Sequence, residues 1–308
     1  MAAILEKLMI QSPHMKSVVK LPPFIYGTAW KKEATERLVY EALSKGFTAK
    51  TLSEDLVAAG ISRAIKDKII RRKDLYLQTK FTSIHGQDPK AMPYDAQLPL
   101  AEQVSASVMS SLRNFNFADV CEHDDEKEPY IDTLVLHSPM PTMAETLEVW
   151  QTLEQFVPGE IRNLGISNCN LFTLMELYER SNIKPVAVQN RFYADTKYDI
   201  GLRKFCEERG IIYEAFWTLA ANPGLLRSLE VRQLSDAFSI SPQAALYCLV
   251  LGLGKVTILN GTTNPETMVE DWRAIKALTD ASESNQRACD ALMMGFKSRI
   301  GQLRRHDE

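Results

Sequence analysis

Short β-rich runs alternate with amphipathic helical stretches along most of this chain of 308 residues. Such alternation predicts parallel strands joined by crossover helices. Three consecutive runs begin at Ile161, Val186 and Ile211, an even interval of 25 residues that holds one strand, one helix and two short loops. This regularity indicates a repeated βα unit rather than an open sheet with insertions. The predicted strands are Phe24–Thr28, Tyr76–Thr82, Ile131–His137, Ile161–Ser167, Val186–Phe192, Ile211–Trp217 and Val256–Asn260.

The eighth strand that a (β/α)₈ barrel requires has to lie between Gly46 and Tyr76, where the strand signal is weak. Residues 47–51 (FTAKT) lead at once into a helical stretch for which Ser53 is a plausible N-cap. We therefore expect residues 47–51 to form a short or irregular second strand, which would leave backbone groups of both neighbouring strands exposed. The predicted helices include Glu33–Lys45, Leu171–Arg180, Arg203–Glu208 and a C-terminal helix within residues 282–308, from Ser282 to Arg305.

Composition and charge point to a globular protein that acts on a small molecule. A hydrophobic share of 45% with 24% charged residues allows a large core. We expect residues 1–308 to form a single barrel domain, with residues 1–20 as an N-terminal extension. The formal net charge of −3 implies no general attraction to nucleic acid or to a membrane surface. Nothing in the sequence indicates the oligomeric state.

The cysteines and the first residues bear on the cellular compartment. The five cysteines are scattered, with no CxxC and no Cys/His ligand spacing, which argues against a disulfide framework and against a metal site. The first 20 residues lack the uninterrupted apolar core of a signal peptide, and no stretch approaches the roughly 18 apolar residues of a membrane span. A cytoplasmic location with reduced thiols is the expectation.

Two loops interrupt the βα rhythm. Ser83–Pro99 is a long polar loop after a predicted strand, and loops of this length in compact domains are often functional. We expect it to cover a site. Cys121–Pro129 is a charge run before the next strand, for which a solvated loop on the opposite face is the expectation.

Several segments in one order carry a family resemblance between about Leu21 and Trp272. They include LPPFIYGTAWKKE, LYLQTKFT, IDTLVLHSPMPT, IRNLGISNCN, KPVAVQNRFYADTKYD, IIYEAFWTLAANP and ILNGTTNPETMVEDW. The chain resembles the aldo-keto reductase family, and closely the subgroup common in fungi. The resemblance implies a TIM-type barrel that binds a nicotinamide cofactor across the C-terminal ends of its strands. It also implies reduction of an aldehyde or ketone by hydride transfer, with fungal secondary metabolism as a possible setting.

The resemblance assigns only half of the family's catalytic set. In the family a tyrosine gives the proton, a lysine and a histidine set its acidity, and an aspartate supports the lysine. Lys80 in QTK matches the lysine, and His137 in VLHSP matches the histidine. Leu52 falls at the tyrosine position, and about eight residues that include the aspartate have no counterpart. The departure falls where the second strand is short.

The resemblance also assigns residues to a cofactor, NADP(H) or NAD(H), and to a substrate pocket. Gly261 and Thr267 stand where the wider family has the lysine and arginine that grip the 2′-phosphate of NADPH, so the preference is not readable. An aromatic pocket suits an apolar or aromatic carbonyl compound. The pocket residues are Trp30, Tyr94, Tyr193 and Trp217. The cofactor residues are Ser167, Asn168 and Gln189 for the carboxamide, Phe216 for the ring, Leu219 near the pyrophosphate, Gly261, Thr262 and Thr263 for the adenosine phosphate, and Glu270 and Asp271 near adenine.

Three interpretations remain open on these residues. The chain is a working NAD(P)H-dependent reductase in which water, Tyr26 or Tyr94 replaces the lost tyrosine. Alternatively, it is a redox-dead or non-redox family member, either a cofactor-binding scaffold or a cyclase or isomerase that uses the barrel pocket. The third interpretation is a gene model with a misplaced exon boundary at Gly46–Leu52.

Overall fold

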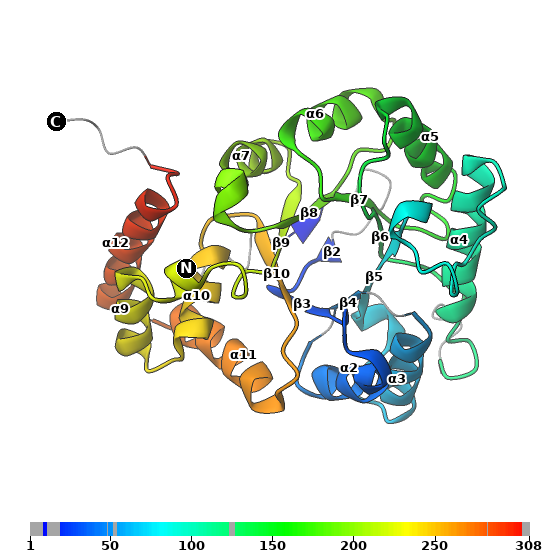
Figure 1. Ribbon diagram of the computed structural model, residues 1–308. Helices are drawn as coiled ribbons and strands as arrows, with labels where there is room; N and C mark the ends of the chain where they lie inside the picture. The colour runs from blue at the N-terminus through cyan, green and yellow to red at the C-terminus, as the bar shows by residue number, and fades with distance from the viewer. Residues whose placement is uncertain are drawn as a thin grey trace.

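Parallel strands form a closed barrel at the centre of the molecule. The structure is a computed structural model that describes residues 9–10, 19–47, 49–51, 54–122, 127–281 and 283–303. The strand order around the barrel is β10-β3-β4-β5-β6-β7-β8-β9, and Figure 1 shows these strands inside a ring of helices. The strands are β3 (Phe24–Gly27), β4 (Ala49–Thr51), β5 (Tyr76–Phe81), β6 (Thr133–Leu136), β7 (Leu164–Ser167), β8 (Ala187–Arg191), β9 (Ile212–Phe216) and β10 (Val256–Asn260).

Helices cover the outside of this barrel and are started by local capping signals. Thr142 and Glu145 form a capping box at α5, and the Asn170 side chain accepts from the backbone N of Thr173 at α6. The principal helices are α2 (Thr35–Ser44), α3 (Glu54–Lys66), α4 (Leu100–Asn114), α5 (Met143–Glu154), α6 (Leu171–Arg180), α7 (Ile200–Glu208), α9 (Leu229–Phe238), α10 (Pro242–Leu251), α11 (Pro265–Thr279) and α12 (Glu283–Arg299), and the short α8 (Pro223–Leu226) precedes α9.

The predicted (β/α)₈ class and the seven predicted strands are confirmed; only Val256–Asn260 keeps both predicted bounds, and the largest shifts are at two of the other strands. β6 and β7 begin two and three residues later than expected, because Ile131 and Ile161 are joined only by an isolated bridge. The helix predicted from Arg203 already begins at Ile200. Of the charge run Cys121–Pro129, residues 123–126 lie outside the described residues.

The second strand of the barrel is the shortest of its strands, as expected. β4 has three residues, yet it pairs with both neighbours, through Lys50 with Tyr26 and through Ala49 with Tyr76. The stub therefore closes the barrel, and the expected gap between β3 and β5 does not appear. Glu54 holds the start of α3 beside it, since its carboxylate accepts from Thr79, Ser111 and Asn114. Leu52 and the expected cap Ser53 lie outside the described residues.

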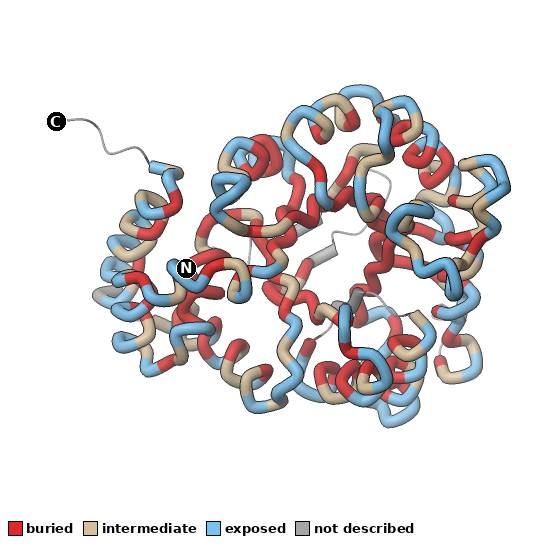
Figure 2. The backbone as a smooth tube through the Cα atoms, viewed as in Figure 1, coloured by how far each residue is buried: buried red, intermediate tan, exposed pale blue. Residues whose placement is uncertain are grey.

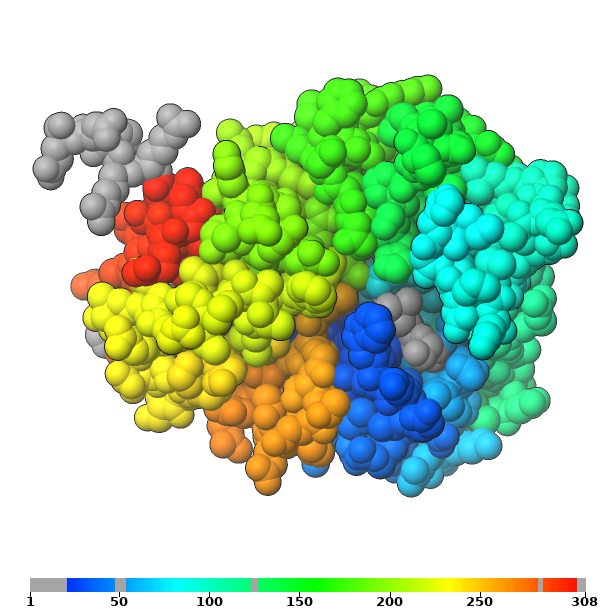
Figure 3. Space-filling view, in the orientation of Figure 1, coloured from blue at the N-terminus to red at the C-terminus, as the bar shows by residue number. Residues whose placement is uncertain are grey.

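The two ends of the barrel differ in chemistry. Figure 2 shows β5, β6 and β7 buried along their length. At the N-terminal end Leu21, Ile25, Tyr76 and Ile212 form an apolar plug. Within the predicted extension 1–20, β1 (Met9–Ile10) pairs antiparallel with β2 (Val19–Lys20). The loops that follow the C-terminal ends of the strands form the face seen in Figure 3.

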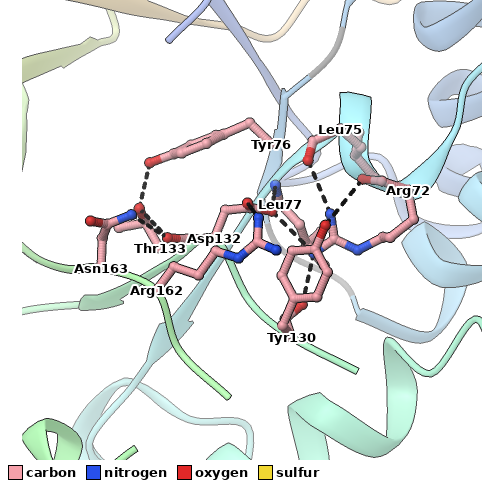
Figure 4. Close-up of polar contacts among 9 residues, drawn as sticks. All are labelled: Arg72, Leu75, Tyr76, Leu77, Tyr130, Asp132, Thr133, Arg162 and Asn163. Atoms are coloured by element: carbon pink, nitrogen blue, oxygen red, sulfur yellow. Dashed lines mark hydrogen bonds and ion pairs between the residues drawn. The ribbon is translucent and has the colours of Figure 1, made fainter. Parts of the chain in front are cut away.

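A buried ionic network ties three strands together at the N-terminal end (Figure 4). Arg72 donates to Asp132 (3.0 Å) and to the carbonyl of Tyr130 (2.8 Å), and both charged side chains are almost fully buried. Arg162 donates to the other oxygen of Asp132 (3.2 Å). The Tyr130 ring lies between the two guanidinium groups, 3.6 and 3.5 Å from its centroid. This network lies at the end of the barrel that serves stability rather than chemistry.

Two composition-based expectations can be compared with the structure. All five cysteines are free and buried. Within the described ranges no single helix is long and apolar enough to cross a membrane, whereas α9 and α10 taken together reach that length and hydropathy but meet at an angle of 107°.

Candidate active site

The candidate catalytic and cofactor residues meet at the C-terminal ends of adjacent strands, where barrel enzymes place their chemistry. Lys80 lies near the end of β5, and His137 follows β6. Ser167 ends β7, Gln189 lies in β8, and Phe216 ends β9. The barrel therefore brings these predicted residues to one mouth.

Lys80 is a buried lysine inside the barrel. Gln78, two residues earlier, bonds across the barrel to Glu214 (2.8 Å), and residues two apart on a strand share a face. The side chain of Lys80 therefore points to the same interior. Burial lowers the pKa of its ammonium group to about 8, while the nearby charge of Glu214 opposes this shift.

Glu214 was not among the predicted site residues, and it lies fully buried at the base of this mouth. Its carboxylate accepts from Gln78 Nε2 (2.8 Å) and from Gln189 Nε2 (2.6 Å). Burial raises the pKa of Glu214, whereas the two glutamines and the charge of Lys80 lower it. A buried carboxylate needs such donors and an opposite charge, because desolvation of an isolated ion is costly.

His137 is held beside a small cavity by a threonine. Its Nδ1 lies 3.0 Å from Thr82 Oγ1, and a cavity of about 330 Å³ is lined by both residues, by Ser83, His85 and Gly86, and by the loop from Ser138 to Pro141. Burial lowers the pKa of His137, and the charge of Lys80 lowers it further. The imidazole is therefore neutral at pH 7 and can offer one N–H and one acceptor. The start of the Ser83–Pro99 loop adjoins this cavity, and cover of a site by the whole loop stays a prediction.

The two tyrosines considered as replacement acids lie in different places. Tyr94 is buried, and its hydroxyl donates to the carbonyl of Thr82 (2.7 Å), next to the histidine. Tyr26 is fully buried in β3. Its hydroxyl donates to the carbonyl of Thr262 (3.0 Å), which lies just after β10, the strand next to β3. Burial raises the pKa of both hydroxyls. Both protons are thus committed to backbone carbonyls.

Hydrogen bonds link the three residues expected to hold a carboxamide. Asn168 Nδ2 donates to the carbonyl of His137 (2.8 Å) and to Ser167 Oγ (3.2 Å). Gln189 Nε2 donates to Gln78 Oε1 (2.9 Å) and to Glu214 Oε2 (2.6 Å). Since both amide groups use their N–H donors, they present their oxygens as acceptors. Ser167 Oγ donates to the carbonyl of Gln189 (2.6 Å).

An aromatic group with an arginine at its centre forms the next part of the rim. Phe216 and Trp217 lie edge to face with 6.4 Å between ring centroids. The guanidinium of Arg191 lies 4.0 Å from the Trp217 centroid, 5.1 Å from that of Tyr193 and 5.9 Å from that of Phe216. Arg191 was also not predicted. Trp217 is half exposed and has a left-handed φ of 59°.

The predicted phosphate turn follows β10 and is hydrogen-bonded to the loop that follows β3. Lys31 Nζ donates to the carbonyl of Gly261 (2.7 Å), and burial lowers the pKa of Lys31 to about 8. Thr262 accepts from Tyr26 as described above, and Thr263 is exposed at the entry to α11. Leu219 is half-buried in the loop after β9, where the amide of the buried Asn222 donates to the carbonyls of Phe192 and Thr218.

One predicted residue does not fit its assigned role, and the roles of Glu270 and Trp30 stay predictions. The expectation that Asp271 contacts adenine or lies on a solvated helix face is wrong, because its side chain is buried and accepts from Asn260 Nδ2 (2.6 Å) beneath β10. Glu270 accepts from the backbone N of Ser241 (2.9 Å) at the start of α10, so its carboxylate has a structural partner. Trp30 is 91% exposed and lines none of the cavities described here.

The residues that sequence reasoning missed share a detectable signal. Gln78 and Glu214 are polar residues at inward positions of apolar strands, two before Lys80 and two before Phe216. Arg191 likewise follows Gln189 by two residues. The period of two along a strand would have placed all three in the barrel interior or at its mouth.

Comparisons with known proteins identify the family of this chain. Residues 47–245 match the model of the Aldo/keto reductase family. The chain is 24% identical over 243 residues to the NAD(P)H-dependent D-xylose reductase of Pachysolen tannophilus, covering 69% of this chain and 67% of the relative. It is 22% identical over 316 residues to the 4-dihydromethyl-trisporate dehydrogenase of Mucor mucedo, covering 90% of this chain and 94% of that protein.

Solved structures support the fold. The aldose reductase of Schistosoma japonicum aligns with a TM-score of 0.70 at 17% identity, covering 96% of this chain and 94% of that chain. A Bombyx mori aldo-keto reductase in complex with NADP aligns with a TM-score of 0.69 at 18% identity, covering 92% and 93%. With its closed parallel barrel and a family match that spans residues 47–245, this chain belongs to the aldo/keto reductase family.

Proposed function

We propose that the protein is an NAD(P)H-dependent oxidoreductase that reduces the carbonyl group of a small molecule. The observation that carries the proposal is the group formed by the buried Lys80 and Glu214 and the half-buried His137 at the C-terminal mouth of the barrel. Family membership and the relatives named as NAD(P)H-dependent reductases support it.

The mouth fits the nicotinamide part of the cofactor. The amide oxygens of Asn168 and Gln189 are acceptors for the NH₂ of a carboxamide, because their own donors are already used. Phe216 offers a ring at the edge of the same group. When bound, the cofactor supplies the hydride for carbonyl reduction. Its preference for a 2′-phosphate stays undecided, since neither Gly261 nor Thr267 carries a charge.

Lys80 is the proposed proton donor in place of the family tyrosine. Addition of a hydride to a carbonyl carbon turns its oxygen into an alkoxide, which needs a proton. An ammonium group with a pKa of about 8 is protonated at neutral pH and is more acidic than an ordinary lysine. The proton passes from Lys80 to the alkoxide oxygen, and the neutral amine regains a proton from solvent. His137 is the proposed hydrogen-bond partner that positions the carbonyl oxygen.

Glu214 is the proposed counter-charge of Lys80, a role that the missing family aspartate would otherwise fill. It keeps the pKa of the buried lysine from falling further. An aspartate on the second strand would approach the lysine from a neighbouring strand, whereas Glu214 approaches from β9 across the barrel. The charge balance of the mouth is thus retained by another route.

The alternative is a barrel that binds the cofactor without redox turnover, as a scaffold, a cyclase or an isomerase. The family resemblance favours it, because the alignment described above places Leu52 at the tyrosine position. Cofactor binding would be common to both functions. Only a measurement of hydride transfer to a substrate therefore distinguishes the reductase from the alternative.

Titration with NADPH and with NADH, followed by quenching of tryptophan fluorescence, tests the cofactor site. We expect saturable quenching with at least one of the two, because Trp217 adjoins Phe216. Gln189→Leu should weaken binding by about tenfold, since it removes one acceptor for the carboxamide. Gln151→Leu, on the exposed side of α5, is the control and should bind as the wild type does. Absence of quenching with both cofactors would contradict the proposal.

A further inference from the structure

A second cavity opens beside the mouth at the C-terminal ends of β7 and β8. Its volume is about 680 Å³, within the range that small-molecule sites occupy. The walls come from the residues after β7, from the end of β8, and from the first turns of α6 and α7. A short 3₁₀ segment (Ala194–Asp199) closes one side. The polar residues that matter most in this lining are Asn168, Asn190, Arg191, Thr196, Lys197 and Asp199.

The guanidinium of Arg191 has aromatic neighbours but no acid to balance it. Its contacts with Trp217, Tyr193 and Phe216 involve the ring faces, and such contacts leave the N–H edge free for hydrogen bonds. Its Nε is buried without a hydrogen-bond partner. Within the described part of the chain, no carboxylate lies within 4.0 Å of its nitrogen atoms. A buried N–H without a partner is costly, so a ligand that accepts from it would bind favourably.

The one acid in this lining is committed elsewhere. Asp199 Oδ2 accepts from Asn190 Nδ2 (2.9 Å) and from the hydroxyl of Tyr213 (2.9 Å). Lys197 adds a second, exposed positive charge to the wall. The cavity therefore carries two cations against one already bonded carboxylate, which favours a negatively charged occupant.

The wall that carries Lys197 is held in a strained conformation. Lys197, Tyr198 and Asp199 have φ values of 52°, 54° and 50°, a left-handed run without glycine. A non-glycine residue in this region is strained and persists only where surrounding contacts hold it. The bonds of Asp199 and the bond from Arg203 Nε to the carbonyl of Tyr198 (2.9 Å) supply those contacts. The fold thus maintains this wall at a cost to stability.

We propose that this cavity binds a small molecule through an anionic group, a carboxylate or a phosphate, with Arg191 as the anchor. The planar guanidinium offers paired N–H groups that match two oxygens of either anion. Asn168 lines the same cavity and donates to the carbonyl of His137, so an occupant lies next to the mouth. The anchor does not depend on redox turnover, and the proposal stands whether or not the barrel reduces carbonyls.

Titration of the full chain with inorganic phosphate and, separately, with acetate at constant ionic strength tests this site. Tryptophan fluorescence is the readout, because an anion on Arg191 alters the cation–π contact with Trp217. We expect a saturable change with at least one anion. Arg191→Met should weaken that affinity about tenfold or more, and Arg191→Lys should give an intermediate loss because the charge stays but the paired geometry is lost.

Arg227→Met provides the matched control, since Arg227 is exposed and lies outside the cavity lining. It should titrate as the wild type does. Far-ultraviolet circular dichroism checks that each variant is folded, and Arg191→Lys keeps the test valid if Arg191→Met does not fold. Response to acetate alone or to phosphate alone identifies the anionic group. Absence of a saturable response to both anions, or coincident curves for the wild type and the folded Arg191 variants, would overturn the proposal.

Discussion

The acidity of Lys80 depends on one other side chain inside the barrel. Burial lowers the pKa of this lysine to about 8, and Glu214 is the charge that opposes the shift. Gln78 and Gln189 fix the position of that charge. Because a proton donor works best when its pKa lies near the operating pH, the pair suits neutral conditions. The proposed proton supply therefore depends on two residues rather than one.

Replacement of Glu214 by glutamine tests this dependence. Glu214→Gln keeps the size of the side chain but removes its charge, so the pKa of Lys80 should fall below about 8. The readout is the pH dependence of labelling at Lys80 by an amine-reactive reagent, followed by peptide mass spectrometry. Labelling should begin at a lower pH in the variant, because the reactive free amine forms earlier. Glu176→Gln, which removes a carboxylate from a surface pair, is the control. Identical labelling profiles for wild type and Glu214→Gln would contradict the role of Glu214.

Sequence and structure agree on some residues of this mouth for a physical reason. Lys80 and His137 stand at strand ends within apolar runs, so their place in a barrel follows once the strands are located. The burial of Asp271 could not be predicted in this way. Polar residues occupy more than one face in the first turns of α11, so the sequence does not identify which of them is buried. The partner of Asp271, Asn260, lies eleven residues away along the chain, at the end of β10.

At the scale of elements, the contact between β10 and α11 makes the stability of the folded protein depend on pH. Burial raises the pKa of Asp271 to about 7, and an unfolded aspartate has a pKa of about 3.9. Between these values the unfolded chain loses a proton that the folded protein keeps. The free energy of unfolding should therefore fall as pH rises from about 4 to about 7.

The variant Asp271→Asn removes this ionisation and keeps an oxygen for Asn260. It should flatten that part of the pH dependence and raise the free energy of unfolding at pH 8 by about 2 kcal/mol or more, since one pKa unit corresponds to about 1.4 kcal/mol. Urea unfolding at a series of pH values gives the measurement. Asp236→Asn, on the exposed side of α9, should leave the pH dependence as in the wild type. A slope that survives in Asp271→Asn would show that another group causes it.

The short second strand marks the limit of prediction at this scale. Its length followed from the sequence, because Phe47–Thr51 leaves little room before α3. Closure of the barrel around it did not follow, since it depends on pairing of Lys50 with both Tyr26 and Leu77 and on the anchoring of Glu54 by other elements. Contacts between segments distant in sequence leave no local signal.

At the scale of the whole molecule, the barrel separates stability at its N-terminal end from chemistry at its C-terminal end. The network of Arg72, Asp132 and Arg162 joins the segments that lead into β5, β6 and β7 (Figure 4). Asp132→Asn leaves the buried guanidinium of Arg72 without a balancing charge and should lower the free energy of unfolding by about 3–5 kcal/mol.

Denaturant unfolding of Asp132→Asn and of Asp280→Asn compares the stability lost from the buried network with that lost from a surface ion pair. Asp280 pairs with Lys276 on the surface, and loss of an exposed pair should cost less than about 1 kcal/mol. Cofactor binding by folded Asp132→Asn should match that of the wild type, because the network lies at the far end of the barrel. Equal stability losses in the two variants would contradict the separate roles of the two ends.

Transfer of deuterium from nicotinamide-labelled NADPH and NADH to a panel of aromatic and aliphatic aldehydes tests the central claim most directly. Mass spectrometry of the alcohol products gives the readout. We predict deuterated alcohol with the wild type, and Lys80→Met should reduce its rate by about 100-fold or more while cofactor binding persists. Saturable cofactor binding without label in any product, or an undiminished rate in Lys80→Met, would contradict reduction through Lys80.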